Sequence, residues 1–524
     1  MSSLGWRLRG DYHRRVTDEQ ADTNPITVLD LFAGCGGLTE GFHQFHPDGS
    51  DKPAFRSVGA VEWDKAAAAS YAMNFGAESR RKRYFDDSPE IYADDITKWT
   101  PRWRKGEIDV VVGGPPCQGF SGLNRNKVGA ERNHLWQHFI RVVVETQPKV
   151  FVIENVDRFV RSPEFADLKD RIGNGNLTNY RLLPAPGTKD DDTEQERAHR
   201  YLLNAADYGA LQARRRTIVI GVRTNVDLRP DRMSYPAETH SRDPLIHQDA
   251  LEGLAVPSDR RKPWLTVDAL FKRTAKMTLF GADLRDGKRH TVREIGWTGP
   301  GPFRTSELHF TRNPEPLSLA RYAAIPPRGN RKDLRGRYLC RPADGAPIIL
   351  EKRGTYRGDD GVLALSGRYI EVADGDSKRR VFTVEYNSEP DDVPSSSGRS
   401  KSRAFRVTLR EDDHDIPATL EYLSTDSWDA HNAGSGDVMG RLRLGEPSVT
   451  IRTEFFKPEK GRYLHPTEDR PITHFEGAKL QGFPDHFLWC GSKTDIARQI
   501  GNAVPIPLGK AIAGAIYEYL RPAG

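Results

Sequence analysis

Between Pro25 and Arg223 the chain alternates short β-branched or apolar runs with stretches of helical character. The apolar runs are residues 26–32 (ITVLDLF), 55–62 (FRSVGAVE), 108–114 (IDVVVGG), 149–156 (KVFVIENV) and 216–223 (RTIVIGVR). Strands this apolar are usually buried on both faces. Helical patterns at 66–75 and 135–147 lie between them, so the order is βαβα and the sheet should be mostly parallel. The pattern therefore predicts a doubly wound α/β domain.

This alternation stops after Arg223. The next stretch is rich in Pro, Gly and Arg with only short strand-like runs, which indicates a separate, mixed or β-rich domain. Apolar periodicity then returns, and 511–520 is predicted to be a helix that packs back on the first domain. The expected division is 1–24 (an N-terminal extension), 25–223, 224–461 and 462–524. Composition predicts loops at 187–199 and 387–403.

Charge and cysteine content narrow the classes of protein. The 524 residues carry 78 Lys and Arg against 73 Asp and Glu, a formal charge of +5, so a nucleic-acid partner has to be inferred from local clusters. The chain opens without an apolar leader and has no apolar run of about 18 residues, which disfavours secretion and a membrane. Cys35, Cys117, Cys340 and Cys490 form no CxxC pair, which argues against zinc and disulfides. The expected location is the reducing cytoplasm.

The first candidate site is the run 30–37 (DLFAGCGG), where a strand should end and a helix begin. Glycines at such a turn let backbone N–H groups approach a ligand. Glu62 and Trp63 end the next strand and offer a carboxylate for ribose hydroxyls and an indole face for a base. The GxxxxGKS/T pattern of a P-loop is absent, which disfavours ATP or GTP. For the run alone, the alternative is an ordinary tight connection.

Three further motifs accompany later strands. Cys117, in the loop 113–121 (GGPPCQGFS), is a nucleophile candidate, although cysteines are more often small buried hydrophobes. Glu154 ends a buried strand, where a carboxylate is costly unless it is functional or bonded to nearby amides. Residues 212–216 (QARRR) lead into the last strand, and alone they would indicate a solvated edge.

Together and in this order, the motifs resemble those of the DNA (cytosine-5) methyltransferase family, bacterial modification type. DLFAGCGG is similar to the family's cofactor motif, GGPPCQGFS to its nucleophile motif, ENV at 154–156 to its acid motif, and QARRR to its QxRxR motif. Residues 465–484 resemble its late structural motif, and 499–505 (QIGNAVP) resemble its last one. The resemblance covers about 25–223 and 436–524.

The resemblance implies a Rossmann-like S-adenosylmethionine-dependent methyltransferase domain with a target-recognition domain at 224–461, and no metal. Glu62 is expected on the ribose hydroxyls of the cofactor, Trp63 on its adenine ring, and Asp95 on its adenine amino group. The implied cofactor-binding residues are Phe32, Gly34, Glu62, Trp63, Asp95, Ile96, Pro116, Asn502 and Val504.

The resemblance also implies the chemistry. Cytosine C5 is a poor nucleophile, so the Cys117 thiolate is expected to add to C6 and push electron density onto C5. Glu154 is expected at N3 of the ring, protonated or sharing a proton, with Arg216 on the cytosine O2 and steadying Glu154. Arg214 is expected near the nucleophile loop and the DNA backbone. No side chain is indicated for removing the C5 proton.

Access to C5 requires the base to be flipped out of the duplex. The loop 118–132 is the expected lid, with a static surface loop as the alternative. Its expected DNA-binding residues are Gln118, Ser121 and Asn124.

Sequence recognition is expected in the second domain. The basic run 321–341 suits phosphate and guanine contacts, unless it is only a solvated basic face. Its expected DNA-binding residues are Arg328, Arg331, Arg335 and Arg337. Residues 343–420 interrupt the family's recognition region, and they could read extra bases, bind a partner or have no specific role.

The resulting expectation is a monomeric enzyme that methylates C5 of a cytosine in a specific double-stranded DNA sequence through a covalent Cys117–C6 intermediate. An RNA cytosine-5 methyltransferase is one alternative, disfavoured by the long recognition domain. A catalytically silent DNA-binding subunit is another, disfavoured because Cys117, Glu154 and QARRR are all intact. The target sequence, and whether a restriction endonuclease or a defence system accompanies the enzyme, are left open.

Overall fold

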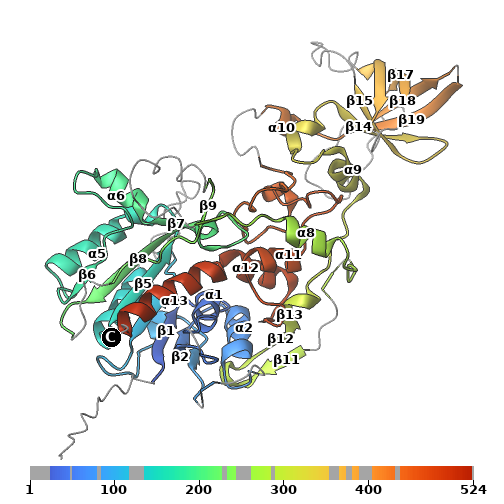
Figure 1. The fold of residues 1–524 in the computed structure, drawn as a ribbon. Coiled ribbons are helices and arrows are strands. Elements are labelled where there is room, and N and C mark those ends of the chain that lie inside the picture. The colour runs from blue at the N-terminus through green and yellow to red at the C-terminus, as the bar shows by residue number, and fades with distance from the viewer. Residues whose placement is uncertain are drawn as a thin grey trace, which may run out of the picture.

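The fold is built on one mixed sheet of eight strands. The computed structural model describes residues 24–47, 50–79, 84–85, 87–116, 135–226, 233–243, 261–281, 283–284, 289–352, 365–372, 380–388, 404–412, 414–430 and 437–521. The strands of the sheet run in the order β3-β2-β1-β4-β5-β8-β6, and β7 also pairs with β8 (Figure 1). Their bounds are β1 (Ile26–Leu31), β2 (Phe55–Val61), β3 (Glu90–Tyr92), β4 (Val110–Gly113), β5 (Val150–Asn155), β6 (Tyr180–Leu182), β7 (Leu202–Asn204) and β8 (Arg215–Arg223).

Strand direction confirms the mostly parallel sheet. Strands β3, β2, β1, β4 and β5 are parallel, whereas β8 runs antiparallel to β5, β6 and β7. The order of strands reverses at β1, because β2 lies on one side of it and β4 on the other. Ligands of such sheets bind outside the carboxyl ends of the strands at this reversal. The end of β1 is therefore where a site is expected.

Helices cover both faces of the sheet, which confirms the doubly wound fold. Side chains of α1 and α13 share one apolar cluster with β1, β4, β5 and β8, while α4 and α5 share another with alternate residues of the same strands. The C-terminal helix predicted at 511–520 is present and begins earlier, at Ile506. The helices of this region are α1 (Gly37–His43), α2 (Lys65–Phe75), α4 (Leu135–Thr146), α5 (Pro163–Gly173), α6 (Glu194–Arg200) and α13 (Ile506–Leu520).

Helix α6 lies where the sequence predicts a loop, at 187–199. Thr193 caps it: the hydroxyl accepts from the Glu196 N–H, and the Glu196 carboxylate accepts from the Thr193 N–H at 2.8 Å. Such a capping box satisfies two backbone donors of the first turn. The acidic residues that make this segment resemble a loop thus also favour the first turn of a helix, because Glu196 completes the capping box with Thr193.

A second body of structure is a closed antiparallel barrel of six strands. Its strands are β14 (Arg337–Pro342), β15 (Ile348–Lys352), β16 (Gly367–Glu371), β17 (Val381–Ser388), β18 (Ala404–Glu411) and β19 (His414–Tyr422). Pairing of β14 with β19 closes it, and Tyr338, Tyr369, Phe382 and Leu409 belong to its separate core. Figure 1 shows the barrel at the far end of the molecule from the sheet. Of the loop predicted at 387–403, residues 389–403 lie outside the described residues.

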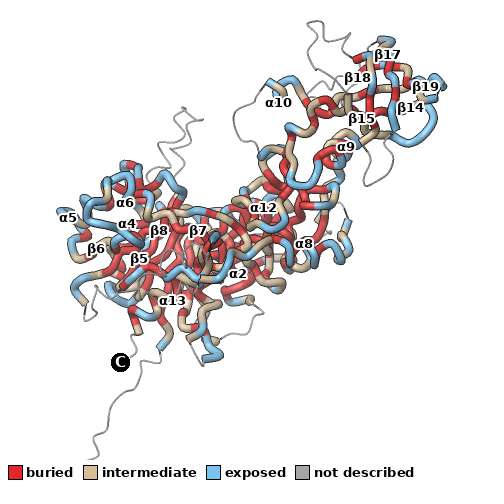
Figure 2. Tube along the Cα trace, turned by 45° about the horizontal axis from the view of Figure 1, so that its top comes forward, coloured by how far each residue is buried: buried red, intermediate tan, exposed pale blue. Residues whose placement is uncertain are grey.

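Shorter elements lie between the sheet and the barrel, and the chain then returns to the sheet. Figure 2 shows buried segments running through the main body and a smaller buried set inside the barrel. The remaining elements are β9 (His240–Ser241), β10 (Lys262–Pro263), α8 (Asp268–Thr274), β11 (Arg289–Val292), β12 (Trp297–Pro300), β13 (Phe303–Arg304), α9 (Pro316–Ala324), α10 (Asp426–Ala430), α11 (His474–Leu480), β20 (Leu488–Trp489) and α12 (Lys493–Asn502).

Helices α1 and α13 approach most closely at a pair of glycines, Gly41 and Gly509. A Cβ on Gly41 would lie 2.8 Å from backbone atoms of Gly509. We predict that Gly41→Ala lowers the free energy of unfolding by about 1–3 kcal/mol, because two backbones would have to separate. Urea unfolding measures the change. Gly173→Ala, at the end of α5 with nothing within 4 Å, is the control and should change stability by less than about 1 kcal/mol. Equal losses in both variants would refute the close approach.

Candidate active site

The turn after β1 has a backbone that few residue types adopt. Phe32, Gly34 and Gly36 have φ angles of 56°, 57° and 93°, in the left-handed region. A Cβ on Gly36 would lie 2.5 Å from the Phe75 ring, so glycine is required there. A Cβ on Gly34 would meet nothing within 4 Å, so this part of the turn borders open space. The predicted cofactor turn is therefore present and accessible.

Glu62, at the end of β2, is bonded to this turn. Its Oε2 accepts from the Gly34 N–H at 2.8 Å, and its Oε1 accepts from the Asp64 N–H at 2.8 Å. Burial raises the pKa of the Glu62 carboxyl to about 7, although both hydrogen bonds act in the opposite direction. The neighbouring Trp63 is 69% exposed, which leaves its indole free to stack on a ligand.

A second buried carboxyl, Asp30, lies behind the turn and is 1% exposed. The Thr39 hydroxyl donates to its Oδ2 at 2.7 Å and lies 3.1 Å from the Tyr71 hydroxyl. Burial raises the pKa of Asp30 to about 7, the Thr39 hydrogen bond lowers it, and the charge of Glu62 raises it further. Two carboxyls that resist ionisation therefore flank the turn.

The other predicted cofactor residues come from three separate elements. Asp95 is half-buried and caps a short 3-10 turn, with its Oδ1 accepting from the Thr97 N–H at 2.9 Å. Ile96, 3% exposed, belongs to the core on the α4 face of the sheet, and Pro116 is half-buried. Asn502 is exposed at the end of α12.

The last motif lies against the start of α1. A Cβ on Gly37 would lie 3.1 Å from the carbonyl oxygen of Val504, which is buried. The C-terminal motif and the turn after β1, separated by more than four hundred residues in sequence, therefore meet. This contact brings Val504 to the region of Gly34 and Glu62.

A carboxylate and a guanidinium form an ion pair at the end of β5. Arg216 Nε lies 2.9 Å from Glu154 Oε1, and the two side chains are 17% and 12% exposed. A Cβ on Gly114 would lie 3.0 Å from Glu154 Oε2, and the Asn155 amide donates to the Pro115 carbonyl at 2.8 Å. The loop that leads to Cys117 is thus anchored beside this carboxylate. Cys117, Gln118, Ser121 and Asn124 themselves lie outside the described residues.

Arg214 occupies a different place from the one the sequence predicts. It is 2% exposed, and it donates to the carbonyls of Ile451 and Gly501, each at 2.9 Å. Burial, aided by the charge of Arg216, lowers the pKa of Arg214 to about 9. The structure therefore places this guanidinium inside the protein, between the start of β8 and the end of α12, where it holds backbone in position.

Gln212, which the sequence analysis assigns no role, is part of the same contact. Its Oε1 accepts from the Ile451 N–H at 2.7 Å, and its Nε2 donates to Gln481 Oε1 at 2.8 Å. The first residue of the QARRR motif is therefore a buried connector, which only its presence in the motif could have suggested.

Each of the four arginines predicted to contact DNA has a partner within the protein. Arg331 is 6% exposed and donates to the Trp428 carbonyl. Arg335 donates to the Asp429 carbonyl at 2.9 Å, and Arg337 pairs with Glu351 at 3.1 Å. Arg328 pairs with Glu446 at 2.6 Å, and its side chain is 59% exposed. The exposed Arg328 is the best placed of the four for an external contact.

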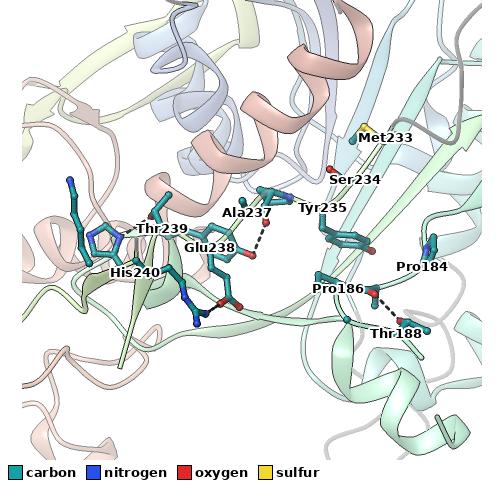
Figure 3. Close-up of a pocket in the computed structure, with 16 residues that line it drawn as sticks. Pro184, Pro186, Thr188, Met233, Ser234, Tyr235, Ala237, Glu238, Thr239 and His240 are labelled. Carbon is teal, nitrogen blue, oxygen red and sulfur yellow. Dashed lines mark hydrogen bonds and ion pairs between the residues drawn. The ribbon is translucent and has the colours of Figure 1, made fainter. Parts of the chain in front are cut away.

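The structure also has a groove of about 1180 Å³ (Figure 3). It is lined by proline and tyrosine side chains, including Pro184, Pro186, Tyr208 and Tyr235, and the Glu238–Arg261 pair. Of the predicted catalytic and cofactor residues that the structure describes, none lines it. We therefore place the candidate active site at the strand ends and not in this groove.

Within the described part of the chain, no group of three or more His, Cys, Asp or Glu could hold a metal ion. The cysteines described there, Cys35, Cys340 and Cys490, are free and buried. None of the described helices is long and apolar enough to span a membrane.

Known proteins resemble this chain over nearly its whole length. The family model described as C-5 cytosine-specific DNA methylase matches residues 26–255 and 384–518. Type II methyltransferase M.XorII of Xanthomonas oryzae pv. oryzae is 27% identical over 506 residues, covering 95% of this chain and 86% of that protein. Type II methyltransferase M.AgeI of Thalassovita gelatinovora is 28% identical, covering 94% and 99%. DNA (cytosine-5)-methyltransferase 1 of Mus musculus is 27% identical, covering 93% of this chain and 28% of that protein.

The raised pKa of Asp30 predicts how stability depends on pH. The folded-state pKa of about 7 lies above the unfolded value of 3.8, so the folded state holds the Asp30 proton more tightly than the unfolded state does. The stability that this proton contributes is fully present below about pH 4 and is lost as the pH rises through 7. Asp30→Asn keeps the shape of the side chain and removes its ionisation. The free energy of unfolding of this variant should therefore decline less between pH 4 and 7 than that of the wild type, by up to about 1.4 kcal/mol per pH unit. Urea unfolding of both proteins at several pH values measures this difference. Parallel pH curves would contradict the prediction.

Proposed function

This chain belongs to the C-5 cytosine-specific DNA methylase family, and we propose that it transfers a methyl group from S-adenosylmethionine to C5 of a flipped-out cytosine in a specific duplex DNA sequence. The single observation that carries the proposal is the Glu154–Arg216 ion pair at 2.9 Å. The pair lies next to Gly114, at the start of the loop that leads to Cys117. A carboxyl steadied by a guanidinium beside a nucleophile loop is what protonation of the ring at N3 requires.

The residues at the end of β1 and β2 fit the proposed cofactor. The ribose hydroxyls of S-adenosylmethionine are donors that a carboxylate such as Glu62 accepts, and the exposed Trp63 ring suits the adenine. The open space at Gly34 leaves room for the ligand. When bound, the cofactor supplies an electrophilic methyl group. Asp95 would accept from the adenine amino group, and Asn502 and Val504 would close the pocket.

Three side chains would carry the chemistry on the base. The Cys117 sulfur forms a bond to C6, and the electron pair of the C5–C6 double bond becomes available at C5. Glu154 holds the proton at N3, and Arg216 orients Glu154 and contacts O2. C5 would take the methyl group as the bond from that methyl to the cofactor sulfur breaks, which would leave the cofactor as its neutral thioether. The C5 proton would then leave to a base, the C5–C6 double bond would re-form, and the bond from the Cys117 sulfur to C6 would break. The buried Arg214 acts by positioning the backbone around this site.

The middle of the chain would read the DNA sequence. We propose the division 1–24, 25–223, 224–461 and 462–524, with target recognition in 224–461. The barrel spans almost the same residues as the segment 343–420, and its separate core suits an accessory module. Double-stranded DNA is the proposed partner, bound by a monomer. A cognate restriction endonuclease and a cytoplasmic location are proposed because the relatives named above include Type II methyltransferases.

Tritium-labelled methyl transfer tests the reaction. The wild-type protein should label duplex DNA and not tRNA, and bisulfite sequencing of plasmid from expressing cells should reveal one target sequence. Duplex carrying 5-fluorocytosine at that target should form an adduct that survives denaturation, because fluorine cannot leave as the C5 proton does. Cys117→Ala should abolish both labelling and adduct. Labelling of tRNA alone would establish the RNA alternative, and wild-type activity of Cys117→Ala would exclude the covalent route.

A second prediction distinguishes residues that bind the cofactor from residues that bind DNA. Asp95→Ala should weaken S-adenosylmethionine binding, measured by calorimetry, by about 1–3 kcal/mol, because the adenine amino group would lose its acceptor. Trp63→Ala should also weaken it, through lost stacking. DNA affinity should change little in either variant. Leu319→Ala, an exposed side chain on α9, is the control and should leave both affinities unchanged. Weakened DNA binding with unchanged cofactor binding would reverse the assigned roles.

A further inference from the structure

The segment 448–453 is fixed between the QARRR motif and the end of α12. Ser448 forms a parallel bridge with Gln212. The Ile451 N–H donates to Gln212 Oε1, and the Ile451 carbonyl accepts from Arg214. A Cβ on Gly501 would collide with the backbone of the segment, so α12 approaches it closely. The backbone of this segment is therefore held firmly beside the catalytic residues.

Arg452 extends from this rigid backbone into solvent. Exposed arginines nearby are neutralised: Arg443 pairs with Glu446 at 3.6 Å and Arg498 with Asp64 at 2.6 Å. For Arg452, by contrast, no carboxylate within ion-pair distance occurs among the residues the structure describes. A guanidinium with a fixed base and no internal partner is available to an external anion.

The position of Arg452 indicates which external anion it would bind. Tyr463, whose hydroxyl donates to the Thr450 carbonyl at 3.0 Å, lies in the field of both Arg452 and Arg214. The Arg214 guanidinium in turn lies in the field of Arg216 and Glu154. Arg452 directly follows Ile451, whose carbonyl accepts from Arg214, and Arg214 lies two residues before Arg216 of the Glu154–Arg216 pair. Arg452 therefore lies on the segment bonded to the start of the strand that carries Arg216, next to the pocket proposed for the cytosine. A nucleotide extruded into that pocket brings its flanking phosphates to the rim.

We propose that Arg452 binds a DNA phosphate next to the target cytosine. The inference rests on the proposed function, because it needs DNA at this pocket. Phosphate contacts fix the position of a protein on the duplex and carry no sequence information. Arg452 would thus hold the flipped nucleotide in register with the Glu154–Arg216 pair without choosing the sequence.

The test compares the affinity of Arg452→Ala, Arg452→Lys and wild type for the duplex that bisulfite sequencing identifies as the wild-type target. Arg452→Ala should bind on the order of tenfold more weakly. The slope of log affinity against log salt should fall in magnitude by about one. Arg452→Lys should keep the slope and lose less affinity. The control is Arg104→Ala, which removes an exposed arginine that precedes β4. The amino end of this strand is opposite to the carboxyl end where the site lies, so the control should match wild type.

Further measurements on the same variants distinguish a phosphate contact from other roles for Arg452. The methylated sequence and the affinity for S-adenosylmethionine should be those of wild type in Arg452→Ala. An unchanged salt slope would overturn the inference. Weakened cofactor binding with an unchanged slope would instead assign Arg452 to the carboxylate of the cofactor, and an altered target sequence would assign it to a base. If the wild-type protein methylates no DNA, the proposed function fails, whereas a failure confined to the Arg452 variants leaves that function standing.

Discussion

The contact on which the site depends is the buried guanidinium of Arg214. It donates to two backbone carbonyls that lie more than two hundred residues away in sequence, on Ile451 and Gly501. Removing one partner of a buried, hydrogen-bonded charge is strongly destabilising, so this contact holds the end of the chain against the sheet. Arg216 follows two residues later, and Val504 follows Gly501 by three residues, so both lie near this contact in sequence. One motif thus combines a buried arginine that holds backbone with one that pairs with Glu154.

Electrostatics at the cofactor turn follow from burial. Burial raises the pKa of both Asp30 and Glu62 to about 7, and the charge of Glu62 raises the pKa of Asp30 further. A cationic ligand placed beside them would favour the charged forms, because opposite charges stabilise a carboxylate. The proposed cofactor carries a sulfonium, so its binding and the ionisation of these two groups are expected to be linked.

In the proposed recognition region, several of the charges that the structure describes are paired within the protein. The barrel surface carries paired charges, such as Arg341 with Glu421 and Arg410 with Asp415. Basic composition alone therefore overstates how much positive charge is available for DNA. Arg328 stays largely exposed despite its partner, and Arg368 and Arg406 of the barrel are also exposed.

The local sequence determined the strands, the helices between them and the order of the chemical motifs, because apolar periodicity and glycine turns are short-range signals. It also predicted roles for Glu62, Trp63, Glu154 and Arg216, which lie at the ends of buried strands or directly after them. Tertiary structure alone decided that Arg214 turns inward, that Gln212 is a connector and that β14 pairs with β19 to close a barrel. Each of these outcomes rests on partners far apart in the chain, and a side chain's role follows from whether such a partner is within hydrogen-bond reach. Neighbouring residues carry no information about that distance.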